Sequence, residues 1–537
     1  MAVLARRLLV AALILAALVR VLHLLELSGD PSFFQPKVDA YYYDQAARVI
    51  ADGDLGFGHE PLRMSPGYFY ALGAVYALFG DGPWAPRVLQ SLLGVLQVAL
   101  IWDLARRMLG AGWAWLPAFG AALYGPFLYF EGHLLAASLA TFLHILCLWL
   151  VIGRMDRGDL RFAPWLGVGL VFGLTAVVRP NALPLVVPLW LACFLAGRET
   201  DATGRVRRVA AAMLALALGG ALAIAPITLR NVLRTGEPIL LTAHGGLNLY
   251  VGNGPGAHGT FRLPDEVPST RDPQSQYRTF HAVAEEALGR PLGAREADAY
   301  WVRRTVDTWI DSPAWAWHIL TRKLYLYWNG RELENVYDYE FAREYQPVLG
   351  APLVQFVHVA PLALCGSLWM LLRGRPRERV LALYLWAVAG AVVLVFVTDR
   401  YRLPVVGPAL LCATFALRRL VTWARERRWL ALAGSAVVLS AAVLVARPVA
   451  VQKSRAQEYH TLGAAWLELG RLDRAEHALA TSLAHNPEFV PAHCSLGELY
   501  EETGDTERAR EHYEVVLRLG KPDGYHVRRA KEGLRRL

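Results

Sequence analysis

Long apolar runs recur along most of the chain, and they constrain its fold more than any other feature. About 20 helical residues cross the ~30 Å hydrocarbon core of a bilayer, and only helices or closed barrels satisfy their backbone hydrogen bonds there. We therefore predict an all-α polytopic membrane protein. Its eleven expected spans are Leu8–Leu27, Pro86–Ala105, Trp113–Phe130, Leu134–Ile152, Trp165–Val178, Ala182–Ala196, Val209–Thr228, Pro352–Leu372, Val380–Val397, Leu403–Leu417 and Trp429–Ala446.

Arginines gather in alternate loops between these runs, for example at Arg106 and Arg107. Short cytoplasmic loops collect Lys and Arg, so the pattern places the N-terminus in the cytoplasm and the C-terminal tail outside it. We expect a multi-pass protein of the plasma (inner) membrane. The formal net charge of +9 is explained by this orientation, and no nucleic-acid partner is predicted.

Three segments on the outer side are too long to be simple turns. They are a first outer loop over residues 28–85, a large outer loop over residues 229–351, and the tail. The first loop contains two helical patterns, Val38–Asp54 and Pro66–Gly80, and we expect the second to lie along the membrane interface. The predicted domains are 1–450 in the membrane and 455–537 as a separate tail.

The tail repeats with a period of 34 residues, which separates Gly463 from Gly497 and Ala475 from Ala509. This period and its Leu-Gly, aromatic, Ala and Pro spacing resemble tetratricopeptide repeats, which form an α-solenoid. Such repeats bind peptides or proteins, so the tail either recruits a protein partner or is a purely structural cap.

Acidic residues occur at two predicted outer span ends. Asp39 lies just beyond the first span beside three tyrosines, where a carboxylate can act as a general base or simply cap a helix. Glu131 and His133 follow the third span and either share that site or mark the water interface. Asp52-Gly53-Asp54 has the form of a metal-binding D-x-D, but an ordinary turn is the favoured interpretation.

Several arginines lie on the outer side, against the usual charge bias. Arg63 either clamps a phosphate or meets anionic lipid headgroups. Arg179 precedes Pro180 and Asn181 between two spans, and Arg400 and Arg402 precede the tenth span. Cations at this rim suit a lipid-linked phosphate leaving group.

Other motifs are sparse. The five cysteines are scattered and form no C-x-x-C pair, so neither a zinc site nor a disulfide framework is indicated. No P-loop is present, which argues against a soluble nucleotide substrate. The glycine-rich stretch from His244 to Phe261 is either a backbone-lined binding loop or a set of turns.

The ordered set of short motifs resembles the GT-C superfamily of membrane glycosyltransferases, in the bacterial branch related to protein mannosyltransferases and the aminoarabinose transferase of lipid A. The motifs are VDAYYYDQAARVIADGD around Asp39, SPGYFY from Ser65, RPN at Arg179, GLNLYVGNGPGAHG from Gly246, KLYLYWNGRELEN from Lys323 and DRYRLP from Asp399. The likeness covers about residues 8 to 450.

The resemblance implies inverting transfer of a sugar from a polyprenyl-phosphate donor to an acceptor, which is a protein, a lipid or a glycan. It implies that Asp39 is the general base and that Arg63, Arg400 and Arg402 contact phosphate. Glu131 falls where relatives carry a second acidic residue, often Asp, and Ala40 replaces a Glu found in many relatives. A divalent metal is possible in this superfamily, but no clear ligand set is evident.

Two other functions compete with the glycosyltransferase. A non-enzymatic scaffold that recruits partners through its repeats explains the tail but leaves Asp39, Arg179 and Arg400 without a role. A transporter requires polar residues within spans and inverted repeats, neither of which is clear in the sequence.

Overall fold

The computed structural model describes residues 2–58, 62–199, 204–267, 273–335, 338–449, 454–520 and 524–537. Over these ranges the protein is helical, and pairing between extended segments is confined to one isolated bridge between Tyr124 and Val354. The chain divides into two compact units. The first consists of residues 1–24 and 36–449, and the second of residues 25–35 and 450–537.

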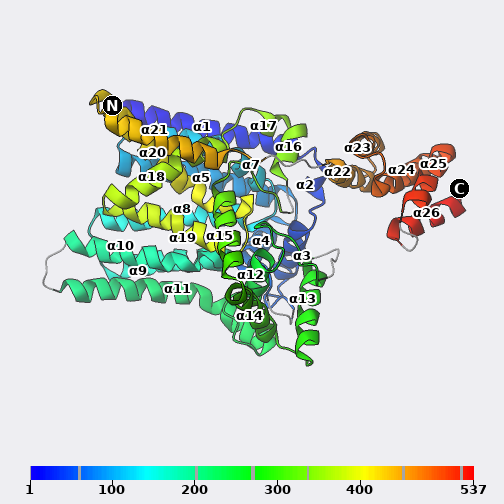
Figure 1. Ribbon diagram of the computed structural model, residues 1–537, viewed down its shortest axis with the longest axis horizontal. Helices are drawn as coiled ribbons and strands as arrows, with labels where there is room; N and C mark the ends of the chain where they lie inside the picture. The colour runs from blue at the N-terminus through cyan, green and yellow to red at the C-terminus, as the bar shows by residue number, and fades with distance from the viewer. Residues whose placement is uncertain are drawn as a thin grey trace. The chain divides into compact units, whose positions relative to one another are not determined.

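The first unit is built on long apolar helices that run side by side (Figure 1). Seven described helices are long and apolar enough to cross a membrane: α1 (Ala2–Leu27), α5 (Trp84–Leu109), α8 (Ala136–Asp156), α11 (Arg205–Thr235), α18 (Phe356–Arg373), α20 (Asp399–Arg425) and α21 (Trp429–Ala446). The neighbouring helices α9 (Phe162–Val178), α10 (Val186–Ala196) and α19 (Pro376–Leu394) coincide with three of the other four predicted spans. The all-helical membrane fold is confirmed, whereas the number of eleven spans stays a prediction.

The third predicted span, Trp113–Phe130, is wrong as a single helix. It is divided into α6 (Trp115–Ala122) and α7 (Gly125–Glu131), because Leu123 and Tyr124 leave the helical conformation. The backbone N–H of Gly125 donates to the carbonyl of Val354, and that of Val354 donates to the carbonyl of Leu123, which satisfies the groups freed by the break. Similarly, the sixth predicted span begins with a 3₁₀ helix, η1 (Pro180–Leu185), before α10.

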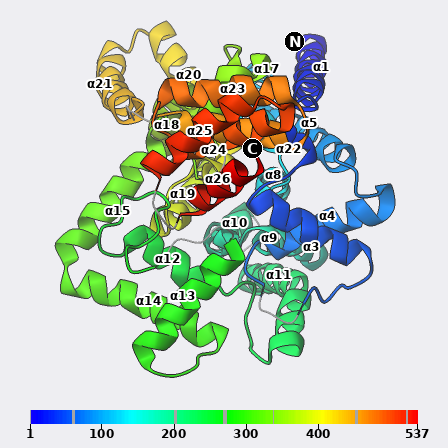
Figure 2. The ribbon, with the colours of Figure 1, turned by 90° about the vertical axis from the view of Figure 1, so that its right-hand side faces the viewer.

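Shorter helices gather at one end of the bundle and cross the direction of the long helices (Figures 1 and 2). From the first loop come α3 (Asp39–Ala51) and α4 (Pro66–Phe79). From the large loop come α12 (Gly245–Asn253), α13 (Pro273–Leu288), α14 (Ala294–Asp311), α15 (Pro313–Trp328), α16 (Tyr339–Tyr345) and α17 (Pro347–Gly350).

Helices α3 and α4 pack against each other through aromatic and polar contacts. The rings of Tyr43 and Tyr68 meet edge to face at 4.9 Å, and Phe69 is fully buried beside them. The Tyr76 hydroxyl donates to Asp44 at 2.6 Å. These contacts fix the start of α3, where Asp39 lies.

The second unit contains two helical hairpins, α22 (Ala456–Glu468) with α23 (Leu472–His485) and α24 (Val490–Thr503) with α25 (Thr506–Leu519), followed by α26 (Tyr525–Arg536). Gly463 and Gly497 occupy corresponding places, where each lets its hairpin partner approach closely. The predicted repeat is therefore visible as a repeated hairpin, while its assignment to the tetratricopeptide class stays a prediction.

The second unit also includes residues 25–35, which the sequence analysis assigned to the membrane domain and the first outer loop. Within this segment the short helix α2 (Pro31–Phe34) packs against α22, and the side chain of Phe33 is 1% exposed. The guanidinium of Arg474 donates to the carbonyl of Gly29 at 3.1 Å. A buried aromatic side chain and this hydrogen bond explain why the segment groups with the tail.

Candidate active site

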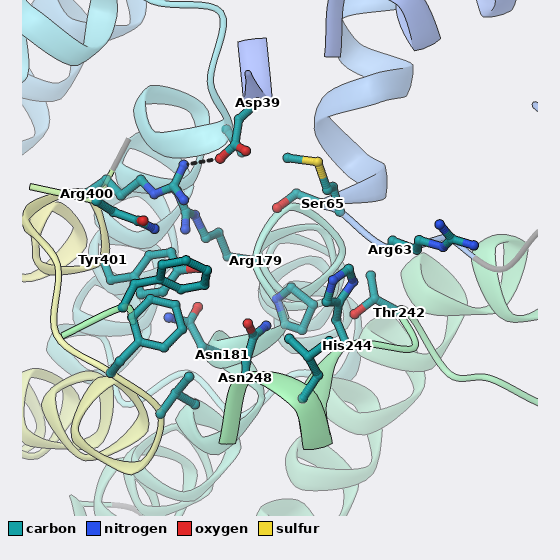
Figure 3. Close-up of a pocket in the computed structure, with 18 of the residues that line it drawn as sticks. Asp39, Arg63, Ser65, Arg179, Asn181, Thr242, His244, Asn248, Arg400 and Tyr401 are labelled. Atoms are coloured by element: carbon teal, nitrogen blue, oxygen red, sulfur yellow. Dashed lines mark hydrogen bonds and ion pairs between the residues drawn. The ribbon is translucent and has the colours of Figure 1, made fainter. Parts of the chain in front are cut away.

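A cavity of about 540 Å³ lies in the first unit, where the loops meet the ends of the long helices (Figure 3). Its walls come from the start of α3, the turn between α9 and η1, the start of α12, α13, and the α19–α20 connection. It brings together four predicted site residues, Asp39, Arg63, Arg179 and Arg400. These residues are far apart in the sequence and meet only through the fold.

Asp39 is the first residue of α3 and is 8% exposed. Val38, directly before it, has a positive φ of 51°, which turns the chain sharply into the helix. The carboxylate Oδ2 accepts a hydrogen bond from Nη1 of Arg400 at 2.5 Å, and Figure 3 shows this contact as a dashed line. A guanidinium partner stabilises the ionised carboxylate, which is the form that a general base requires.

Arg179 lies beside this pair, and its guanidinium stacks on the ring of Tyr401 at 4.7 Å. The residue is 8% exposed, and among the described residues it forms no ion pair. Its Nε is buried without a hydrogen-bond partner. A buried cation without a carboxylate partner is costly, so this end of the cavity favours an anionic ligand.

The opposite side of the cavity carries Arg63, His244, Thr242 and Asn248 (Figure 3). The guanidinium of Arg63 stacks on Tyr277 at 4.0 Å. Burial, together with the nearby charge of Arg63, lowers the pKa of His244 to about 4. The imidazole is therefore neutral at physiological pH, and this side offers neutral hydrogen-bonding groups next to a single cation.

An apolar wall completes the cavity and consists largely of the end of α19 and the residues after it, Ala391, Val392, Val395 and Phe396. Lys323 of α15 holds this wall from behind, because its Nζ donates to Asn253 Oδ1 at 2.6 Å and to the carbonyl of Val395 at 3.1 Å. At Gly252 of α12 an added Cβ would lie 1.7 Å from the carbonyl oxygen of Val395, so only glycine fits there.

The structure does not bring Glu131 and His133 to this cavity. Glu131 is buried and pairs with Arg20 of α1, at 2.8 Å from Oε1 to Nη2. His133 bonds through Nδ1 to the carbonyl of Tyr129, and Gln90 of α5 holds both backbone carbonyls, of Glu131 and His133. These polar groups secure the turn between α7 and α8, which corrects the expectation that they share a site with Asp39.

Arg402 also lies outside the lining of the cavity. Arg400 and Arg402 are two residues apart on α20 and so lie on nearly opposite faces of the helix. Arg400 pairs with Asp39, whereas Arg402 is buried and pairs with Glu332 at 2.5 Å. Its Nη1 donates to the carbonyl of Asn329 at 2.6 Å, so it secures the chain after α15. Arg402 is therefore placed to hold the fold and not to contact a ligand.

His244 and Tyr277 are among the cavity residues that the sequence analysis did not predict as site residues. His244 begins the glycine-rich stretch. The first part of this stretch forms the helix α12, which differs from the loop or set of turns expected from the sequence. Tyr277 lies on α13 and carries no local motif. Among the described residues no group of three or more His, Cys, Asp or Glu side chains is arranged to hold a metal ion.

The fold and the cavity together define an all-helical membrane protein with a cationic site at one end of its bundle. Residues 60–228 match the family of dolichyl-phosphate-mannose-protein mannosyltransferases. This match confirms, over that part of the chain, the resemblance to the GT-C membrane glycosyltransferases. A comparison with curated proteins gives no match.

Solved structures of membrane glycosyltransferases share low identity with the chain. An oligosaccharyltransferase of Archaeoglobus fulgidus, solved with zinc and sulfate, is 16% identical with a TM-score of 0.43, covering 88% of this chain and 56% of its own. ArnT of Cupriavidus metallidurans, bound to undecaprenyl phosphate, is 13% identical with a TM-score of 0.43, covering 95% and 81%. The chain thus spans little more than half the length of the oligosaccharyltransferase.

Proposed function

We propose that the protein is a glycosyltransferase that moves a sugar from a polyprenyl-phosphate donor to an acceptor at the extracytoplasmic face of the membrane. The observation that carries this proposal is the ion pair between Asp39 and Arg400 beside Arg179, which is buried and has no ion-pair partner among the described residues, all within one cavity. One carboxylate and two guanidinium groups supply a base and an anion-binding site in contact with each other. The family match over residues 60–228 supports the same class of reaction.

In this mechanism the donor phosphate binds at Arg179 and competes for the guanidinium of Arg400. Asp39 then accepts the proton of the acceptor nucleophile, whose oxygen or nitrogen attacks the anomeric carbon of the sugar. The bond between that carbon and the phosphate oxygen breaks, and its electrons leave with the phosphate. The arginines stabilise the charge that develops on the departing group, and attack from the opposite side inverts the anomeric centre.

Other side chains in the cavity can contact the sugar and the apolar part of a substrate. Burial raises the pKa of Tyr43 to about 12, so its hydroxyl stays protonated and can donate to a sugar or phosphate oxygen. Asn181, Asn248 and the neutral His244 offer hydrogen bonds to sugar hydroxyls. The apolar wall of Val392, Val395 and Phe396 accommodates an apolar part of the donor or acceptor.

The test is sugar transfer by the purified full chain in lipid nanodiscs, supplied with labelled polyprenyl-phosphate sugars. We expect wild-type protein to consume one donor and Asp39→Asn to lower the rate by ~10²–10⁴-fold, the usual contribution of a general base. Asp52→Asn is the matched control, because Asp52 is an exposed carboxylate at the other end of the same helix. Full transfer by Asp39→Asn would contradict the role of Asp39, and the absence of transfer by wild-type protein with every donor would favour the scaffold.

A further inference from the structure

Helix α15 belongs to the large outer loop in sequence but lies against the bundle in space. It packs against α19 and α21, and in both ribbon views it runs across the direction of the long helices (Figures 1 and 2). Its inner face buries Ile319, Lys323 and Leu326. If the long helices cross the membrane, a helix with this direction lies in the plane of the membrane.

The outer face of α15 is apolar and uncovered. Trp317 is 74% exposed, and Leu324 and Tyr325, about two turns further along, are 41% and 42% exposed. Thr321, between them, directs its hydroxyl to the carbonyl of Trp317 at 2.7 Å, so it adds little polarity to this face. Such an exposed stripe is unusual on a surface that faces water.

A polar flank lies between the apolar stripe and the buried face. His318 is exposed, and Arg322 turns its guanidinium toward the carbonyl of His258 at 2.9 Å. The helix thus has one side against protein, one apolar side and one polar edge. That division is typical of a helix embedded at a membrane surface, with its aromatic rings near the headgroups.

The apolar stripe continues the surface of a candidate membrane span. The backbone N–H of Gly330 donates to the carbonyl of Ala446 at 2.8 Å, and Asn329 donates to that of Arg447 at 2.6 Å, which ties the end of α15 to the end of α21. Helix α21 exposes apolar side chains along its length, including Leu444 at 68%. A membrane span with exposed apolar side chains faces lipid. The last residues of α15 therefore lie next to a lipid-facing surface.

We propose that α15 lies in the lipid leaflet at the cavity end of the bundle, with Trp317, Leu324 and Tyr325 among the acyl chains and headgroups. The occupant of this surface is the bilayer itself. Lys323 on the opposite face of α15 holds the apolar wall of the cavity, so the helix separates that wall from lipid. On the proposed function, α15 sets the depth at which a lipid-linked head reaches Asp39.

The test places a nitroxide label on single cysteines in the full chain, reconstituted in vesicles of phosphatidylethanolamine and phosphatidylglycerol. The background variant is Cys365→Ala, which removes the half-exposed native thiol; the other four cysteines are buried. Labels replace Trp317 and Leu324 on the stripe, His318 on the polar edge of the same helix, and the exposed Asp265 of the same outer loop. Relaxation by oxygen, which concentrates in lipid, is compared with relaxation by a water-soluble nickel chelate.

We expect oxygen to relax the labels at 317 and 324 several-fold more effectively than the nickel chelate, with the opposite order at 265 and an intermediate value at 318. Equal exposure to nickel at 317, 324 and 265 would overturn the proposal. Spin–spin broadening at 317 that persists in detergent would also overturn it, because a second copy of the chain would then cover the stripe. None of these measurements requires catalysis, so loss of the proposed function leaves their outcome unaffected.

Discussion

Asp39 and Arg400 are separated by 361 residues in the sequence, yet they form an ion pair of 2.5 Å at the edge of the cavity. One comes from the first loop and the other from the first turn of α20. Both side chains are about nine-tenths buried. Each group therefore stabilises the other in its charged form, and a ligand phosphate that attracts Arg400 would release the carboxylate of Asp39.

Removing one member of this pair is expected to destabilise the protein more than removing both. Arg400→Gln leaves the carboxylate of Asp39 buried without its partner, which costs up to ~3–5 kcal/mol. Asp39→Asn combined with Arg400→Gln leaves two neutral groups, so much of the loss should be recovered. Thermal unfolding of the two single variants and the double variant in detergent gives the coupling energy as a double-mutant cycle. Strictly additive effects would contradict a direct interaction.

Substitution of Arg179 is expected to weaken phosphate binding without destabilising the protein. Because it has no carboxylate partner among the described residues, Arg179→Gln should leave the unfolding temperature unchanged or slightly higher. Loss of a charge-assisted contact of ~1.5–3 kcal/mol should weaken the binding of undecaprenyl phosphate by ~10–100-fold. The ligand-induced rise in unfolding temperature measures this binding. A variant that still shows the full rise would exclude Arg179 as the phosphate site.

Glu131 is expected to stabilise the fold and not to take part in transfer. Glu131→Gln removes the buried partner of Arg20, and the free energy of unfolding should fall by ~3–5 kcal/mol. Gly94→Ala should have a similar effect, since an added Cβ would lie 2.2 Å from Oε1 of Glu131. The rate per folded molecule should stay close to wild type in both variants. A selective loss of rate with unchanged stability would restore Glu131 as a catalytic candidate.

The sequence predicted the fold where the physics is local. Apolar runs such as Leu8–Leu27 and Trp429–Ala446 form helices long and apolar enough to cross a membrane, and their length and composition alone predict this. The break between α6 and α7 was missed because Leu123 and Tyr124 are compatible with a helix. The alternative there is stabilised by the backbone of Val354, a distant partner.

The residues of the cavity also divide into those that a local sequence signal indicates and those that depend on contacts with distant residues. Arg179 and Arg400 were predicted because arginines on the outer side contradict the usual charge bias, and Asp39 and Glu131 because they are carboxylates at outer span ends. The structure pairs Glu131 with Arg20, which lies on another helix, and the periodicity of the sequence does not reveal which charges meet. Tyr277 could not be predicted, because its role depends on the stacking of Arg63 on its ring.

The tail is expected to protect the segment before Asp39. Within the second unit Phe33 is buried, and Arg474 donates to the carbonyl of Gly29. Deletion of residues 458–537 should therefore expose this segment to chymotrypsin, with cleavage after Phe33 or Phe34 at least tenfold faster than in the full chain. Mass spectrometry of the fragments locates the cut. Equal protection in the deleted protein would show that residues 25–35 do not depend on the tail.

Lys323 is expected to make stability depend on pH. Burial lowers its pKa from the ordinary 10.5 to about 7, and among the described residues no carboxylate pairs with it. The folded protein thus binds fewer protons than the unfolded chain between these two values, so stability should rise with pH from about 7 to about 10, by up to ~1.4 kcal/mol per pH unit. Below pH 7 both states are protonated and this contribution is constant.

Thermal unfolding between pH 7 and pH 10 should show a flatter dependence of stability on pH for Lys323→Met than for wild type. Arg322→Met, at the exposed neighbouring position, should retain the wild-type slope. Parallel curves for wild type and Lys323→Met would show that Lys323 keeps its proton in the folded state, and the cation would then be stabilised by Asn253 Oδ1 and the carbonyls of Leu394 and Val395.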